Sequence, residues 1–423
     1  MRSHYKRIGD YVTQIKLKNT DDSISSLKGI NINKHFMPSV ANINGTDLSK
    51  YRVVKKNQFA FNPMHVGRDE VLPISMLEDD EPIIVSPAYV VFEVKDEEEL
   101  LPAYLMMWCR RSEFDRNAWF MTDNSVRGGF SWADFCDMEL PVPSIDKQRE
   151  IVREYNVVND RIALNEQLTQ KLEDTAQAIY KQWFVEFEFP ISKEYAESIG
   201  KPELEGKPYK SSGGEMRYCD LLEKEIPQHW NGHSLKELAL IKGGKRLPKG
   251  EELVSEKTAH PYIKVADLGN KKFCVLSKKF EYLEKDVQAQ ISRYTVKKDD
   301  LVISIVGTIG ITKIIDGSLD GANLTENCAK IVELEKISTS FLYHFLMSNE
   351  GKKQLDERIV GAVQAKLPIY NIETFKLAVP PQEVMSVFQD NAIKIDTYIH
   401  QKQNEIVRLV ELKEMLLSSV SKV

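Results

Sequence analysis

The sequence feature that most constrains the fold is an internal repeat in which both copies keep one constant offset in residue number. Asn124–Phe130 and Leu140–Pro143 correspond to Gly361–Leu367 and Leu377–Pro380 (363 − 126 = 237 for Val126 and Val363). The identical pairs at this offset are Val126 with Val363, Leu140 with Leu377, Val142 with Val379, and Pro143 with Pro380. Because a repeat usually encodes one structural unit at each occurrence, the chain is expected to contain two similar halves.

A heptad pattern follows each copy of the repeat at the same offset, and it tests the repeat by a second criterion. One core position is held by Ile151, Val158, Asn165, Leu172 and Ile179, and in the second copy by Phe388, Ile395, Lys402, Leu409 and Leu416. The other core position is held by Tyr155, Ile162, Thr169, Ala176 and Trp183, and by Ala392, Ile399, Ile406, Lys413 and Val420. The sequence therefore predicts a long helix at the end of each half.

Two helices of roughly 38 residues would each be about 57 Å long, and neither could leave its apolar seam in water. We expect them to pack on each other. A pseudo-two-fold relation between the halves requires that they run antiparallel, with the polar midpoints Asn165 and Lys402 close together. The alternative is that each helix packs only on its own domain.

The segments ahead of the helices combine short β-like runs with helical patterns. Ile83–Val85, 89–94 and 301–306 read as strands, whereas 103–108 and 341–347 read as helices. The expected fold is α+β, with two globular domains separated by an antiparallel coiled coil. The predicted boundaries are 1–145 and 226–381 for the domains, 146–189 and 382–423 for the helices, and 190–225 for a Pro/Gly/Ser-rich linker.

Composition limits the compartment and the kinds of site. No run approaches the roughly 20 apolar residues of a membrane span, and the N-terminus lacks the apolar region of a secretory signal. The five cysteines are odd in number and scattered, which fits neither a disulfide framework nor a zinc site. We expect a cytoplasmic protein without membrane contact or bound metal.

Several short motifs occur in a characteristic order. They are Val85–Phe92, Leu140–Pro143 with Gln148–Ile151, Lys181–Phe187, Gly206–Met216, and Ile226–Trp230 with Ile241–Pro248. In this order, and together with the repeat, the chain resembles the specificity (S) subunits of type I restriction-modification systems over essentially its whole length. It departs from their pattern at Met1–Ile8, where the Ile-Pro…Trp opening of the second domain is missing, so the first strand is not defined by the sequence.

The resemblance implies two target-recognition domains, each reading one half of a split double-stranded DNA site. It also implies partners, namely two methyltransferase subunits that bring S-adenosylmethionine and restriction subunits that use ATP and Mg²⁺, with no cofactor in this chain. The formal net charge of −6 is unusual for a DNA-binding protein. We therefore expect basic residues to be concentrated on one side and the isolated chain to bind weakly. The alternative is a coiled-coil interaction scaffold without DNA specificity.

Motifs for bond-making chemistry are weak. Phe61–Met64 lacks the second proline and the aromatic residue of an amino-methyltransferase motif, and is interpreted as a strand end and turn. Glu93 and Lys95 downstream of Asp79 have the spacing of a nuclease site, but chance is the better explanation. Gly307–Gly310 is too short for a phosphate-binding loop and is interpreted as a tight turn. The chain is predicted not to be an enzyme.

Candidate DNA-contacting residues come from the repeat and from one basic loop. Arg127 and Gln364 are equivalent positions before the last strand of each domain, and arginine suits a guanine edge whereas glutamine suits an adenine edge. Lys242, Lys245, Arg246 and Lys249 form a cationic loop suited to phosphate, and Arg68 and Lys366 are further candidates. The alternatives are a loop that contacts only solvent and a plain solvated turn.

Overall fold

The computed structural model describes residues 5–39, 46–64, 66, 70–122, 129–361 and 364–422. Its contacts divide the chain into unit 1, which comprises Met1–Glu166 and Asn404–Val423, and unit 2, which comprises Gln167–Gln403. Each unit contains part of both long helices together with one α+β domain, so the expected fold class is confirmed. No helix among the described residues is both long and apolar enough to cross a membrane.

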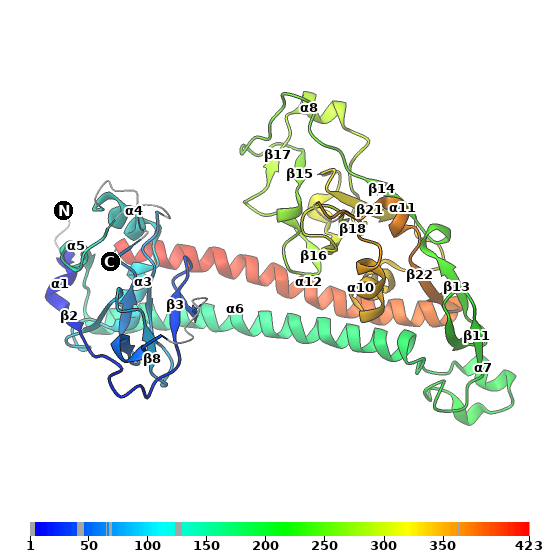
Figure 1. Cartoon of the computed structure of the whole chain (residues 1–423), viewed down its shortest axis with the longest axis horizontal. Helices are drawn as coiled ribbons and strands as arrows, with labels where there is room; N and C mark the ends of the chain where they lie inside the picture. Colours follow the sequence, from blue (N-terminus) through cyan, green and yellow to red (C-terminus); the bar gives the residue numbers. More distant parts are fainter. Residues whose placement is uncertain are drawn as a thin grey trace. The chain divides into compact units, whose positions relative to one another are not determined.

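The domain of unit 1 is built on a sheet with the strand order β2-β9-β6-β7 (Figure 1, blue to cyan). Its strands are β1 (Tyr5–Arg7), β2 (Val12–Ile15), β3 (Lys28–Ile30), β4 (Phe36–Pro38), β5 (Arg52–Val54), β6 (Phe59–Phe61), β7 (Ile74–Met76), β8 (Ile83–Val85), β9 (Val90–Val94) and β10 (Glu139–Pro141). Its helices are α1 (Ile8–Tyr11), α3 (Pro102–Cys109), α4 (Ser112–Phe120) and α5 (Trp132–Asp137). The core is aromatic, because the ring of Phe92 packs against Phe59, Phe61 and Phe135.

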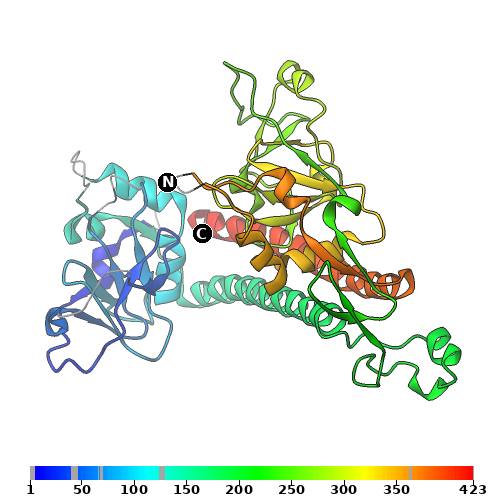
Figure 2. The same ribbon diagram turned by 45° about the vertical axis from the view of Figure 1, so that its right-hand side comes forward.

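The domain of unit 2 contains a sheet with the order β14-β21-β18-β19-β16 and a smaller one with the order β17-β15-β20 (Figures 1 and 2). Its strands are β11 (Met216–Cys219), β12 (Lys224–Pro227), β13 (Asn231–Ser234), β14 (Leu240–Gly243), β15 (Pro261–Ile263), β16 (Phe273–Cys274), β17 (Glu281–Tyr282), β18 (Leu301–Ser304), β19 (Thr312–Ile315), β20 (Asn323–Leu324), β21 (Cys328–Val332) and β22 (Lys376–Val379). Its helices are α7 (Lys193–Ser198), α8 (Lys285–Gln290), α9 (Thr339–Met347), α10 (Asn349–Asp356) and α11 (Ile369–Ile372).

The repeat governs the order of the elements in both halves. Five pairs of elements begin at the offset of the repeat, namely α3 and α9, α4 and α10, α5 and α11, β10 and β22, and α6 (Ile145–Tyr180) and α12 (Gln382–Ser419). The opening strands match in a second way, because β1 pairs antiparallel with β10 as β13 pairs with β22. The first strand, which the sequence did not define, is therefore β1. The predicted duplication is confirmed.

The two long helices pack antiparallel within each unit, as predicted. In unit 1, the Lys413 ammonium lies 5.4 Å from the centre of the Tyr155 ring, and Arg161 Nε donates to Glu405 Oε1 at 2.6 Å. In unit 2, the rings of Tyr180 and Phe388 lie 6.3 Å apart. The contacting residue on α12 has a lower number the further along α6 the contact lies, so the two helices run antiparallel. The alternative, in which each helix packs only on its own domain, is wrong.

The predicted seam residues of both helices face away from water. Ile151, Val158 and Asn165 are buried, and the half-buried ones are Leu172, Ile179, Ile395, Lys402, Leu409 and Leu416. Asn165 belongs to unit 1 and Lys402 to unit 2. The 3₁₀ turn Val420–Lys422 that follows α12 also joins the core of unit 1, where Val420 is fully buried.

Helix α6 ends earlier than the predicted boundary at residue 189. It passes at Tyr180 into a π-helical turn, Lys181–Val185, and Phe187 then takes a positive φ of 61°. The reason is aromatic packing, since Phe184 and Phe187 lie against Trp230 in the core of unit 2. The 190–225 segment folds back on the same core, and Tyr209 stacks on Phe189 with ring centres 4.7 Å apart.

Candidate nucleic-acid interface

Several loops of unit 2 emerge at one end of its five-stranded sheet. The register pairs Gly243 with Ala329, Ser304 with Cys328, and Ile303 with Thr312. In antiparallel strands these pairs bring the ends of β14 and β18 beside the starts of β21 and β19. The loops 244–249, 305–311 and 325–327 therefore leave the sheet together, and we call this region the sheet end.

The predicted cationic loop is fixed to the sheet end by its backbone. Lys245 N donates to Leu324 O at 2.8 Å, and Tyr262 Oη donates to Lys245 O at 2.8 Å. Gly244 allows the close approach, because a Cβ there would lie 2.0 Å from Thr325 O. The start of the loop, at Gly244 and Lys245, is thus held to the sheet end by its backbone.

The four cations of this loop are not equivalent. Lys242 is paired with Glu333 at 2.8 Å and Arg246 with Glu326 at 2.7 Å. Lys245 lies 5.7 Å from the centre of the Tyr294 ring, and neither it nor Lys249 has an ion-pair partner among the described residues. Two of the four predicted positions are therefore available to a phosphate without first breaking an ion pair.

The ion pairs shift the pKa values of Arg246, Glu326 and Glu333 in the directions that favour their charged forms. The hydrogen bond to Glu326 raises the pKa of Arg246. Partial burial would raise the pKa of Glu326, but hydrogen bonds, first of all from Arg246, hold it below its usual value. The hydrogen bond from Lys242 likewise lowers the pKa of Glu333.

A pocket of about 360 Å³ adds residues that the sequence analysis missed. It is lined by Lys242, Gly243, Arg293, Tyr294, Thr295, Leu324 and Lys330. Arg293 is exposed and, within the described part of the chain, has no ion pair, whereas Lys330 donates to Thr295 O at 2.6 Å. No motif or repeat position marks Arg293; only its place beside the cationic loop does.

Gln364 lies at the tip of a short hairpin. Val360 and Lys366 exchange two backbone hydrogen bonds of 2.9 Å, and Leu367 N donates to Ile305 O at 2.9 Å. These bonds attach the hairpin to the loop that follows β18. The side chains of Gln364 and Lys366 are exposed, so both predicted residues reach solvent near the sheet end.

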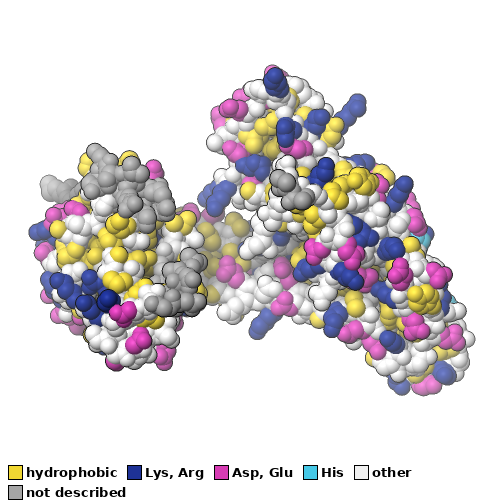
Figure 3. Space-filling view, viewed as in Figure 1, with side chains coloured by type: hydrophobic (Ala, Val, Ile, Leu, Met, Phe, Trp, Pro, Cys, Tyr) yellow, Lys and Arg dark blue, Asp and Glu magenta, His cyan; other side chains and the backbone are white. Residues whose placement is uncertain are grey.

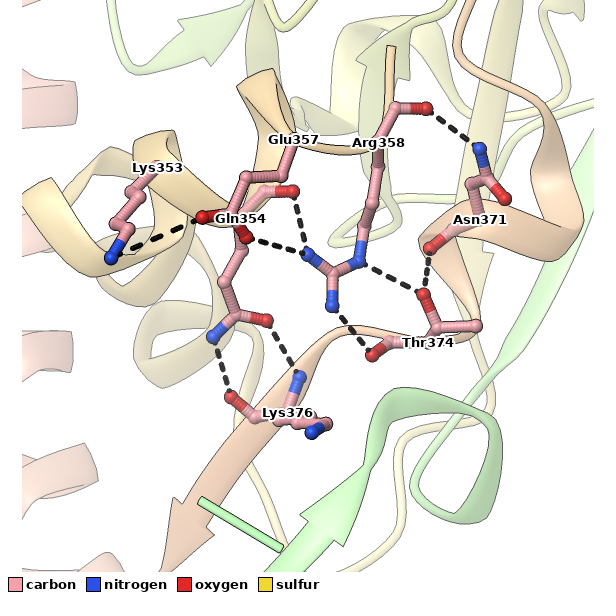
Figure 4. Close-up of polar contacts among 7 residues, drawn as sticks. All are labelled: Lys353, Gln354, Glu357, Arg358, Asn371, Thr374 and Lys376. Carbon is pink, nitrogen blue, oxygen red and sulfur yellow. Dashed lines mark hydrogen bonds and ion pairs between the residues drawn. The ribbon is translucent and has the colours of Figure 1, made fainter. Parts of the chain in front are cut away.

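A group of polar residues holds the base of this hairpin (Figure 4). The Arg358 guanidinium donates to Gln354 O, Thr374 Oγ1 and Thr374 O at 2.8, 2.9 and 3.1 Å. Asn371 Nδ2 donates to Arg358 O at 2.7 Å, and the Gln354 amide bridges both backbone polar groups of Lys376. The chain on either side of the hairpin is thereby fixed to α10, α11 and β22.

Two predicted residues, Arg127 and Arg68, lie outside the described residues. The weaker motifs have ordinary structural roles. Asn62 Oδ1 accepts from Met64 N at 3.0 Å, which makes Phe61–Met64 the expected strand end and turn. Glu93 accepts from Gln58 at 2.8 Å, Lys95 donates to backbone carbonyls, and 307–310 forms the turn between β18 and β19.

The sheet end can bind a polyanion and present polar groups to its base edges. Lys245, Lys249 and Arg293 supply cations, and Gln364 supplies an amide with a donor and an acceptor. Figure 3 shows Lys and Arg side chains projecting from the lobe that carries α8 and β17. The net charge of −6 does not contradict binding of a polyanion at the sheet end. Two acidic residues, Glu333 and Glu326, neutralise Lys242 and Arg246 of the loop, and the other acidic residues are distributed over the chain.

Comparison with known proteins assigns this architecture to a class. Residues 227–408, which contain the sheet end, the hairpin and most of α12, match the family model of the type I restriction modification DNA specificity domain. The matched part of the chain is thus a DNA specificity domain.

Relatives extend the match to nearly the whole chain. It is 23% identical over 427 residues to the type I restriction enzyme HindI specificity subunit of Haemophilus influenzae, which covers 91% of this chain and 90% of that protein. It is 24% identical over 295 residues to the MjaIX specificity subunit of Methanocaldococcus jannaschii, covering 66% and 59%. Residues 227–408 thus carry a type I restriction modification DNA specificity domain, and over nearly its whole length the chain is similar to type I specificity subunits.

A solved structure supports the fold. The crystal structure of a type I restriction-modification S subunit from M. genitalium superposes with a TM-score of 0.55 at 13% identity, covering 99% of this chain and 95% of that one. At this identity the similarity concerns the fold alone. It agrees with two domains and two long helices.

Proposed function

We propose that this chain reads a bipartite double-stranded DNA target, with one half-site per recognition domain. The observation that carries the proposal is the series of five element pairs that begin at the offset of the repeat, because it gives each half the same domain followed by the same long helix. Two equivalent readers on one helical pair suit two half-sites separated by a fixed gap. In unit 2, the reading surface would be the sheet end with the Gln364 hairpin.

The proposal assigns the chemistry to partner subunits. Two methyltransferase subunits would bring S-adenosylmethionine, and restriction subunits would use ATP and Mg²⁺. The relatives are named as subunits of restriction enzymes, which supports assembly with other subunits. This chain would contribute recognition and spacing only.

The test is selection from random duplex DNA by gel shift, with and without the cognate methyltransferase subunit. We expect a bipartite motif in the retained DNA, and stronger retention with the partner present. No enrichment even with the partner would contradict the proposal and favour an interaction scaffold.

The helices of unit 1 offer a docking surface for a methyltransferase. Val157 and Leu164 on α6 are 64% and 54% exposed, one heptad apart, and Val407 on α12 is 53% exposed. Because apolar side chains in water favour a partner surface, we expect Val157→Glu with Leu164→Glu to weaken co-purification about tenfold or more. The control is Asn156→Glu, which adds a charge at a neighbouring exposed position. Equal retention of the partner by both variants would exclude this surface.

The cationic loop should act through phosphates. Lys245→Ala with Lys249→Ala is expected to lower the slope of log affinity against log salt by about 1.8, since each phosphate contact contributes roughly 0.9. The loss should be similar for all sequences. Lys201→Ala with Lys207→Ala removes the same charge from the 190–225 segment and should leave the slope unchanged. Gel shifts at several salt concentrations measure both variants, and equal slopes would contradict a phosphate role for the loop.

A further inference from the structure

A buried ion pair connects the second recognition domain to α12. Lys272, which directly precedes β16, has a side chain with no exposed surface, and its Nζ donates to Asp396 Oδ1. The other carboxylate oxygen of Asp396 accepts from Ser340 Oγ of α9 at 2.8 Å. One carboxylate of the long helix thus receives hydrogen bonds from two separate elements of the domain.

The surroundings of Lys272 extend the connection to α6. Its Nζ lies 3.4 Å from His344 Nε2 and 4.9 Å from the centre of the Tyr343 ring. His344 Nδ1 in turn lies 2.9 Å from Gln177 Oε1 on α6. Burial lowers the pKa of His344 well below its usual value, so the ring is neutral and can accept from the ammonium. The domain and both long helices of unit 2 therefore meet at this one lysine.

A second polar contact between the domain and α12 lies one helical turn further along the helix. His400 Nε2 is 2.6 Å from Asp316 Oδ2, and the His400 ring stands edge-on to Phe273 at 5.9 Å. The acid here belongs to the domain, whereas in the first contact it belongs to α12. Residues four apart face the same side of a helix, so Asp396 and His400 together fix both the rotation and the translation of the domain on α12.

The described part of the first half has no corresponding buried ion pair between its domain and α6. The position on α6 that corresponds to Asp396 is Asn159, which carries no charge (396 − 237 = 159). The buried lysine of unit 1, Lys34, pairs instead with Asp115 of α4, inside its own domain, at 2.7 Å. Among the described residues, the connection between domain and helix through a buried lysine is therefore specific to the second half.

Stability alone does not account for a buried pair of this kind. The desolvation of two charges offsets most of their attraction, and well-packed apolar residues in the same place are often equally stable. What a buried pair adds is a penalty for every arrangement in which either charge loses its partner. A domain that slipped along α12 by one turn would leave Lys272 and Asp396 buried and unpaired.

We propose that the Lys272–Asp396 pair is the positioning element that holds the second recognition domain at a single register on α12, and that it thereby selects the gap between the two half-sites. The first part concerns the protein alone. The second part rests on the proposed function, because a gap exists only for a bipartite target.

The first test measures the register without DNA. The variant is Lys272→Met with Asp396→Leu, which replaces the pair by apolar side chains of similar size. Spin labels at Glu256→Cys in the domain and Asp390→Cys on α12, both exposed, report the distance between the two parts. We expect the distance distribution of the variant to broaden about twofold while thermal unfolding stays cooperative. The control is Lys298→Met, an exposed lysine beside the same domain–helix groove, which should leave the distribution unchanged.

The second test measures the gap in the assembled complex with methyltransferase subunits. Duplexes carrying the selected half-sites at the preferred gap, and at gaps one base pair longer or shorter, compete for methylation. We expect the preference for the correct gap to fall about tenfold in the double variant and to be unchanged in Lys298→Met.

The outcomes of the two tests distinguish the role of the ion pair in positioning the domain from its role in selecting the gap. An unchanged distance distribution in a folded double variant would overturn the positioning role. A broadened distribution with an unchanged gap preference would overturn the gap role while leaving the positioning role intact. Failure of the wild-type protein to select any bipartite target would count against the proposed function and would leave the spin-label result to decide the first part.

Discussion

Gln364→Arg is expected to change one base of the second half-site, from adenine to guanine. The amide of glutamine matches the donor and acceptor of adenine in the major groove, whereas arginine matches the two acceptors of guanine. One good bidentate pair is worth about 1–3 kcal/mol of discrimination against the wrong base. Sequencing of duplexes selected by the assembled complex, wild-type against variant, measures the change.

The structure predicts that this substitution changes only the side chain at position 364. The hairpin base is held by Arg358 and Asn371, so a change at the exposed tip does not disturb the chain on either side. The same change at Gln290, at the exposed end of α8, is the control and should leave the selected motif as it is. If both variants select the wild-type motif, Gln364 does not read a base.

Deleting one heptad from each long helix should shorten the preferred gap by about three base pairs. Residues 166–172 of α6 and 403–409 of α12 are the matched segments, because their numbers differ by the offset of the repeat (403 − 166 = 237) and because they leave Asp396 and His400 in place. Seven helical residues span about 10 Å, and base pairs are stacked every 3.4 Å or so. Selection from random duplexes gives the gap directly.

The control for length replaces the same segments by copies of the preceding heptads, 159–165 and 396–402, so that sequence changes, length does not, and Asp396 and His400 stay in place. This variant should keep the wild-type gap. An unchanged gap after the deletion would mean that the helices do not act as a ruler, whatever the recognition domains do.

Local and periodic features could be predicted from the sequence with little error. The run Ile83–Val85 is β8, and the helical patterns at 103–108 and 341–347 are α3 and α9. The seam of the long helices was also predicted, because burial follows heptad spacing along one face. The end of α6 was not, since Phe184 and Phe187 turn the chain into the aromatic core around Trp230 before the predicted boundary at residue 189.

The candidate site was predicted only in part. Gln364 was found because the repeat aligns it with Arg127, and the cationic loop because its charges are adjacent in sequence. Arg293 carries no such signal, and only folding brings it to the pocket beside Lys242. Sequence also could not show that Lys242 and Arg246 are neutralised by Glu333 and Glu326, which are distant along the chain.

Two equivalent halves, each ending in a long amphipathic helix, can be deduced from the amino-acid sequence, because duplication and heptad spacing are visible along the chain. Where the second domain sits on its helix cannot be deduced in this way. That position depends on contacts such as Lys272 with Asp396, 124 residues apart, whose partners no local pattern connects. Burial of charge is a property of the packed molecule, so it appears only when the elements that exclude water are in place.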